Sequence, residues 1–127
     1  MTTVAIVDDA LIIRMQMKKF FEDAMGYTVV AQGGDGNEAI KIFKEGSPDL
    51  MTLDLTMPNK NGVEALREIL QNSPKAKVIV LSAIKDKAMI DEALALGAKG
   101  FISKPLQFNS PPYIEELKQQ IRKIVGE

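Results

Sequence analysis

The chain has 127 residues, of which 46% are hydrophobic and 26% charged, as expected of one globular domain with a hydrophobic core. Its 16 basic and 17 acidic side chains give a net charge of −1, which offers no electrostatic basis for direct binding of nucleic acid. The sequence contains neither cysteine nor histidine, which excludes disulfides, thiolate or imidazole metal sites and a serine–histidine–aspartate triad.

The first segment of the chain is predicted to be a buried strand followed by a helix. Residues 3–7 form a continuous apolar run rich in β-branched residues, and the acidic pair Asp8-Asp9 ends it. A helical stripe of apolar side chains follows between residues 10 and 25, at Ile13, Met17, Phe20, Phe21 and Ala24. Gly26 is expected to end this helix as the glycine that follows its last turn.

The next two strand–helix pairs repeat this order and place an aspartate at an unusual position. Residues 27–31 are the expected second strand, and a helix covers about residues 37–44. The third strand ends at Asp54, and another helix is expected over about residues 62–71. Aspartate is disfavoured inside strands and is rarely buried without a partner. In open α/β sheets, functional residues lie at the carboxyl ends of the strands, so Asp54 is a candidate functional residue. The alternative is that Asp54 only caps a loop or a helix.

The fourth and fifth strands also lead into polar residues. Residues 77–81 form the expected fourth strand, which stops at Ser82, and Asp86 is expected to cap the following helix. Residues 100–102 form a short fifth strand, and Lys104 follows it. Two further polar side chains are therefore expected near strand ends.

Five strand–helix units with short connections predict an α/β fold with a doubly wound, five-stranded parallel sheet and helices on both faces. The pair Ser110-Pro111 fits the start of the last helix, with Ser110 as the capping residue and Pro111 as the first helical residue. At this chain length, the flavodoxin-like strand order 2-1-3-4-5 is the natural choice. Residues 1–127 show no internal linker, so we expect a single domain.

The expected strand ends suggest a metal site. In the order 2-1-3-4-5, strands one and three are neighbours, so Asp8, Asp9 and Asp54 would meet at one edge of the sheet, with Ser82 and Lys104 beside them. Carboxylates that close repel one another by several kcal/mol at an effective dielectric constant of ~20. A divalent cation would offset this repulsion, and oxygen-only ligands favour Mg²⁺ or Mn²⁺ over zinc. The same acidic pair disfavours a flavodoxin, because it would repel the FMN phosphate.

Together these residues resemble the receiver domain of two-component response regulators, and in particular the CheY-like chemotaxis regulators. The resemblance covers essentially the whole chain. It is carried by Asp8-Asp9, by Leu53-Asp54-Leu55-Thr56-Met57-Pro58 with Gly62, by Ser82-Ala83 and by Lys104-Pro105.

The resemblance implies a phosphorylation-controlled switch and not a classical enzyme, although the protein would catalyse its own phosphorylation and dephosphorylation. Asp54 would accept a phosphoryl group from the phosphohistidine of a sensor histidine kinase. Asp9 and Asp54 would ligate Mg²⁺ directly, Asp8 through water, and Thr56 through its backbone carbonyl. Lys104 would hold one phosphoryl oxygen.

The resemblance also implies how the switch works. Ser82 would hydrogen-bond a phosphoryl oxygen, and Phe101 would turn inward into the space that Ser82 leaves. The Lys104-Pro105 peptide would be cis. The surface formed by the fourth helix, the fifth strand and the last helix would then change and bind a flagellar motor switch protein or another output protein.

One residue and one segment depart from the family pattern. Ile84, two residues after Ser82, is bulky and would shield the phosphoryl group, which suggests slow self-dephosphorylation. The segment 106–112 is longer than expected and borders the partner surface, so the partner could differ from that of the usual chemotaxis regulator.

Two alternative functions stay open. A phosphorelay receiver, or the receiver domain of a larger regulator, would use the same residues, although the position of the last helix favours a stand-alone protein. From another class, a Mg²⁺-dependent aspartyl phosphatase would carry a second acid two residues after its nucleophile, where this chain has Thr56, and a lid for which it has no room.

The sequence also bears on localisation. The chain begins without the charged and then apolar pattern of a signal peptide. No apolar run approaches the ~20 residues that a membrane span requires. We therefore expect a cytoplasmic protein that does not insert into a membrane.

Overall fold

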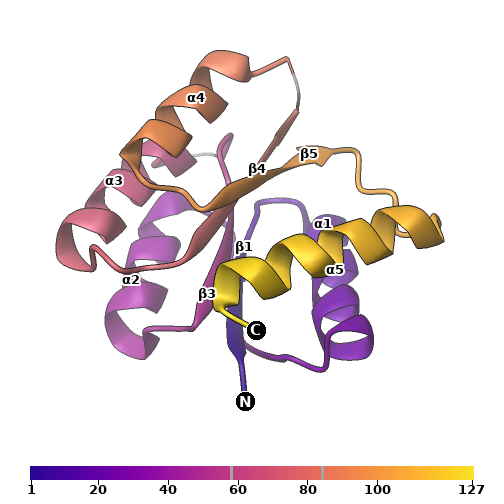
Figure 1. Cartoon of the computed structure of the whole chain (residues 1–127). Helices are drawn as coiled ribbons and strands as arrows, with labels where there is room; N and C mark the ends of the chain where they lie inside the picture. Colours follow the sequence, from indigo (N-terminus) through magenta and orange to yellow (C-terminus); the bar gives the residue numbers. More distant parts are fainter. Residues whose placement is uncertain (58, 84) are drawn as a thin grey trace.

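The computed structural model describes residues 1–57, 59–83 and 85–127 and has a central parallel sheet (Figure 1). The strands are β1 (Thr3–Val7), β2 (Thr28–Gly33), β3 (Leu50–Asp54), β4 (Val78–Ala83) and β5 (Gly100–Lys104). Within these described ranges they form one five-stranded sheet in the order β2-β1-β3-β4-β5. The predicted fold class and strand order are therefore confirmed.

Helices cover both faces of the sheet. They are α1 (Leu11–Lys19) with its π-helical continuation η1 (Phe20–Ala24), α2 (Gly36–Gly46), α3 (Gly62–Asn72), α4 (Lys87–Leu96) and α5 (Pro111–Val125). Figure 1 shows α2, α3 and α4 on one face and α1 and α5 on the other. Among the described residues, no helix combines the length and the apolar character that crossing a membrane requires.

The two faces of the sheet form two separate hydrophobic cores. Ala5 and Val7 of β1 pack with the layer of α2, α3 and α4, whereas Val4 and Ile6 pack with the layer of α1, η1 and α5. This division follows from the strand geometry, because successive side chains point to opposite faces. Every residue of β3 is buried, because helices cover both faces of the sheet at this strand. This explains why its sequence is mostly apolar and does not alternate with polar residues.

The first helix differs from its prediction in its last turns. The expected apolar stripe does face the core, but the helix becomes π-helical at Phe20. Phe20 and Phe21 are both buried in this π-helical part. Gly26 ends the segment with φ +69°, as predicted.

Several strands extend further than predicted because their backbone pairing continues. β4 runs through Ser82, which is in register with Ser103, and does not stop at Ser82. β5 likewise continues to Lys104, and β2 continues to Gly33 opposite Val7 of β1. The pairing carries the polar residues to the edge of the sheet inside regular strands.

The last helix starts at the predicted residue, but the predicted cap by the Ser110 side chain is wrong. Ser110 is the residue before α5, and Pro111 is its first residue, as predicted. The Ser110 side chain, however, makes no capping hydrogen bond in the described part of the chain. Pro111 and Pro112 both lack a backbone N–H, so the first turn of α5 offers fewer donors to a capping side chain.

Candidate functional site

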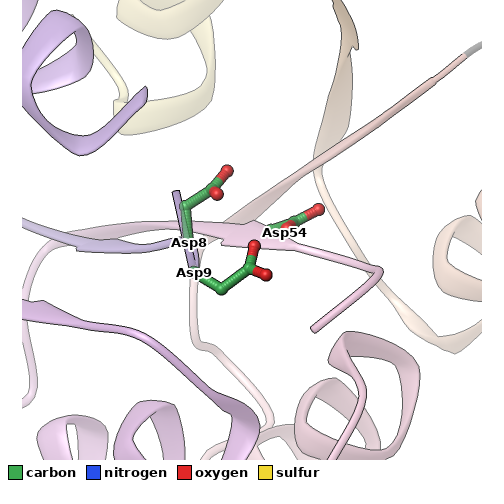
Figure 2. Close-up of side chains that lie close together, drawn as sticks. All are labelled: Asp8, Asp9 and Asp54. Atoms are coloured by element: carbon green, nitrogen blue, oxygen red, sulfur yellow. The ribbon is translucent and has the colours of Figure 1, made fainter. Parts of the chain in front are cut away.

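Three aspartate side chains lie together where β1 and β3 end (Figure 2). Asp8 and Asp9 follow β1, Asp54 is the last residue of β3, and these two strands are hydrogen-bonded neighbours. One carboxylate oxygen of each residue lies within 4.8 Å of the other two. Asp8 and Asp54 are each 1% exposed, whereas Asp9 is exposed to solvent. The arrangement therefore combines two buried acids with one that is open to solvent.

Lys104 places a positive charge against the two buried acids. From the end of β5, its Nζ reaches to 3.0 Å from Oδ2 of Asp8 and to 3.4 Å from Oδ1 of Asp54. Burial disfavours the charged ammonium, but hydrogen bonding and attraction to the two aspartates outweigh burial, and the pKa of Lys104 is raised. Lys104 therefore stays charged and offsets part of the negative charge.

The Asp54 carboxyl remains incompletely satisfied despite this lysine. Burial and the charge of Asp8 raise its pKa to about 6, against the opposing effects of Lys104 and of the Thr56 N–H. That N–H donates to Oδ1 of Asp54 at 3.2 Å, whereas Oδ2 is buried without a hydrogen-bond partner among the described residues. A buried carboxylate oxygen without a partner is costly. Three clustered carboxylates and one unmatched buried oxygen fit a hard divalent cation such as Mg²⁺.

The loop after β3 approaches the Asp54 backbone so closely that it requires glycine at position 62. The Gly62 N–H donates to the carbonyl of Leu55 at 3.0 Å. A Cβ atom on Gly62 would lie 2.2 Å from the carbonyl oxygen of Asp54, which is far inside van der Waals contact. Asn61 then caps the start of α3, because its Oδ1 accepts the N–H of Glu64 at 3.0 Å. Pro58 lies outside the described residues.

Ser82 lies at the same edge of the sheet, and its hydroxyl contacts Asp86, which is predicted to cap a helix. It follows Leu81, which is in register with Asp54, and it is 1% exposed. Its hydroxyl donates to Oδ2 of Asp86 at 3.0 Å. Asp86 does precede α4, but the prediction that its side chain caps this helix is wrong, because the carboxylate accepts the Ser82 hydroxyl instead. Ile84, the predicted shield of the phosphoryl group, lies outside the described residues.

The remaining predicted residues occupy β5 and the connection that follows it. The Lys104-Pro105 peptide is cis, as the resemblance implied. Phe101 is partly buried and packs against the core on the side of α2, α3 and α4. Its inward rotation, like the role of the Thr56 carbonyl, stays a prediction.

Arg14 is a site neighbour that the sequence analysis missed. Its Nη1 donates to the backbone carbonyl of Asp8 at 2.6 Å, which ties α1 to the end of β1. In the sequence, Arg14 is one of several charged residues off the apolar stripe of the first helix, and its spacing from Asp8 carries no recognisable signal.

Comparisons with known proteins identify the family of the chain. Residues 4–111 match the family model of the response regulator receiver domain. The chemotaxis protein CheY of Thermotoga maritima is 47% identical over 104 residues, which cover 82% of this chain and 86% of that protein. Protein CcdB of Bacillus subtilis is 45% identical over 107 residues, which cover 84% of this chain and 88% of that protein.

Solved structures show the same similarity. A chain in the crystal structure of the CheX–CheY–BeF3–Mg²⁺ complex from Borrelia burgdorferi matches with a TM-score of 0.85 and 30% identity, over 97% of this chain and 88% of that chain. The response regulator domain of Thermotoga maritima CheB matches with a TM-score of 0.85 and 35% identity, over 99% and 97% of the two chains.

Proposed function

The chain belongs to the response regulator receiver family, and we propose that it accepts a phosphoryl group on Asp54 with the help of Mg²⁺ and thereby switches the binding of a partner protein. The observation that carries this proposal is the environment of Asp54. Its carboxylate is buried at a strand end, has an unpartnered Oδ2 among the described residues, and lies 3.4 Å from the Lys104 ammonium. Asp54 thus offers a nucleophilic oxygen next to the positive charge of Lys104.

Asp54 acts as the nucleophile in the proposed reaction. With a pKa of about 6, its carboxyl is mostly ionised at pH 7. A carboxylate oxygen forms the new bond to phosphorus while the bond from phosphorus to the donor breaks, and the donor leaves with the electron pair. For a phosphohistidine donor the leaving atom is an imidazole nitrogen. The product is an acyl phosphate, which adds about −1.5 to −2 units of charge by analogy with other phosphorylated side chains.

The neighbouring residues hold the charges that this reaction brings together. Asp8, Asp9 and Asp54 would bind Mg²⁺, with the Thr56 carbonyl as a further ligand. When bound, the ion supplies positive charge between two anionic reactants. Lys104, which already neutralises buried carboxylate charge, is placed to donate to a phosphoryl oxygen. Beside Asp54 the Thr56 side chain offers a hydroxyl and no carboxyl, which favours a switch over an aspartyl phosphatase.

We place this switch in chemotaxis, with a sensor histidine kinase as the phosphoryl donor. The support is the high identity to CheY proteins from several bacteria. The partner would be a flagellar motor switch protein or another output protein, docking on the surface of α4, β5 and α5. A CheY relative in complex with CheX makes a CheX-like protein a further candidate partner.

Beryllium fluoride, whose shape is close to that of a phosphoryl group, tests the site without a kinase. With Mg²⁺ and beryllium fluoride together at one hundred times the dissociation constant, we expect Tm to rise by roughly 5–10 °C, because a ligand of the native state stabilises it by mass action. Asp54→Ala is expected to abolish this rise. Asp91→Ala, on the exposed side of α4, is expected to retain it. A rise in Asp54→Ala equal to that of the wild type, or none in the wild type, would contradict the proposal.

A further inference from the structure

The Ser82 hydroxyl already has a hydrogen-bond partner in the resting structure. It donates to Oδ2 of Asp86 at 3.0 Å from a residue that is 1% exposed. A serine hydroxyl carries one proton and donates one hydrogen bond at a time. The proposed function requires the same hydroxyl to donate to a phosphoryl oxygen on Asp54. The bond to Asp86 therefore has to break before the bond to the phosphoryl group can form.

Asp86 occupies a position at which aspartate ordinarily caps a helix, but it does not act as a cap here. Two other helices of this chain begin with such a residue. Asp35 before α2 and Asn61 before α3 each accept a backbone N–H of the first helical turn, at 2.8 and 3.0 Å. Asp86 makes no such bond within the described residues. Its ψ is 40°, whereas the two capping residues have ψ of 175° and 167°. The bond from Ser82 and the non-extended backbone of Asp86 go together with the missing cap of α4.

We propose that Asp86 is a positioning residue that exchanges the Ser82 hydroxyl for a backbone N–H of the first turn of α4 when Asp54 is phosphorylated. The inference rests on the proposed function, because the phosphoryl group supplies the competing acceptor. In the resting state, the charge-assisted bond holds the hydroxyl away from Asp54. After phosphorylation, the released carboxylate accepts the N–H of Ala88 or Met89 and benefits from the helix dipole.

The exchange would connect the phosphorylation site to the proposed partner surface. To cap α4, the backbone of Asp86 has to rotate from its ψ of 40° toward the extended values of Asp35 and Asn61. That rotation changes the first turn of α4 and the connection that leads into it. A single hydrogen bond lost at Ser82 would therefore become a backbone change at the helix that the partner is proposed to contact.

Two substitutions of Asp86 separate its two roles. Asparagine caps a helix as well as aspartate does, but as a neutral acceptor it binds the Ser82 hydroxyl more weakly. Alanine does neither. At saturating Mg²⁺, we expect Asp86→Asn to bind beryllium fluoride about fivefold more tightly than the wild type. We expect Asp86→Ala to bind it about fivefold more weakly than Asp86→Asn, because the new cap cannot form. Both affinities can be measured by calorimetric titration.

Asp91→Ala is the matched control for charge. Asp91 lies on the same helix, and its carboxylate pairs with Lys87 at 2.9 Å on the exposed surface. Its removal deletes one negative charge of α4 without touching Ser82, so the affinity for beryllium fluoride is expected to stay that of the wild type.

Ser82→Ala tests the exchange in the absence of any phosphoryl group. With the hydroxyl removed, Asp86 is free to cap α4, and we expect the amide hydrogen of Ala88 or of Met89 to exchange several-fold more slowly in NMR spectra. This slowing is expected to disappear in the double variant Ser82→Ala/Asp86→Ala. In the Ser82→Ala background, Asp86→Asn is expected not to increase the affinity for beryllium fluoride, because the hydrogen bond between residues 82 and 86 is already absent.

These measurements distinguish the exchange from simpler accounts. Equal tightening by Asp86→Asn and Asp86→Ala would indicate charge repulsion alone and would overturn the exchange. Unchanged amide exchange in Ser82→Ala would overturn it as well. If the wild type fails to bind beryllium fluoride with Mg²⁺, the proposed function and its link to phosphorylation fail together. In that case the amide exchange still decides whether Asp86 caps α4 once Ser82 releases it.

Discussion

Lys104→Met is expected to lower the free energy of unfolding of the metal-free protein by about 2–3 kcal/mol at pH 8, because removal of one partner leaves buried charges uncompensated. Methionine retains the length and the apolar stem of the side chain, so the change removes mainly the ammonium. Asp8 and Asp54, each 1% exposed, would lose the cation that lies 3.0 and 3.4 Å from their oxygens. Urea denaturation in the presence of EDTA measures the loss.

Two controls identify the source of this loss. Lys87→Met removes a lysine whose pair with Asp91 lies on the exposed surface, so it is expected to cost less than about 0.5 kcal/mol. Addition of Mg²⁺ is expected to restore much of the stability of Lys104→Met, because a cation returns to the carboxylates. Equal small losses in both lysine variants would show that Lys104 does not neutralise the site.

The second large effect is an unusual dependence of stability on pH. The folded protein raises the pKa of Asp54 from 3.8 to about 6. Between these values the folded state holds a proton that the unfolded state has lost, so stability falls as pH rises. We expect the metal-free wild type to lose about 2–3 kcal/mol from Asp54 between pH 4 and pH 7, after which this contribution is constant.

Asp54→Asn isolates this contribution from those of other acids. The pKa values of Asp35 and Asp49 are lowered by hydrogen bonds from backbone N–H groups, so these residues add stability that is lost as pH falls through their folded pKa. Both are retained in the variant, and their effects cancel in the comparison. Measured by urea denaturation with EDTA, Asp54→Asn is expected to match the wild type near pH 4 and to exceed its stability at pH 7. Parallel pH profiles for the two proteins would contradict the assignment.

The sheet and the meeting of the acids could be predicted because both follow from local patterns and one topological rule. Continuous apolar runs and helical stripes indicated each element, and the strand order made Asp8, Asp9 and Asp54 neighbours. The closeness of Gly62 to the Asp54 carbonyl was not recognised, although the glycine itself was part of the family pattern. A glycine in a loop is compatible with many turns, and only the folded backbone shows which atom it approaches.

The remaining contacts depend on local backbone geometry that residue preferences do not encode. Asp86 was predicted to cap a helix because aspartate before a helix usually does so, but Ser82 is brought to it at the end of β4 and competes for the carboxylate. Arg14 reaches the Asp8 carbonyl only because α1 folds back against β1. The π-helical turn at Phe20 was likewise not predicted, because an apolar stripe does not distinguish a π turn from an α-helical turn.

Intact-mass spectrometry after incubation with Mg²⁺ and acetyl phosphate tests the central claim most directly. The wild type is expected to gain the mass of one phosphoryl group, because acetyl phosphate can donate it to the Asp54 carboxylate without a kinase. Asp54→Asn lacks the nucleophilic oxygen, and EDTA removes the cation, so neither sample is expected to gain this mass. A folded wild type without any gain, or an equal gain in Asp54→Asn, would contradict the account of Asp54 as the phosphoryl acceptor.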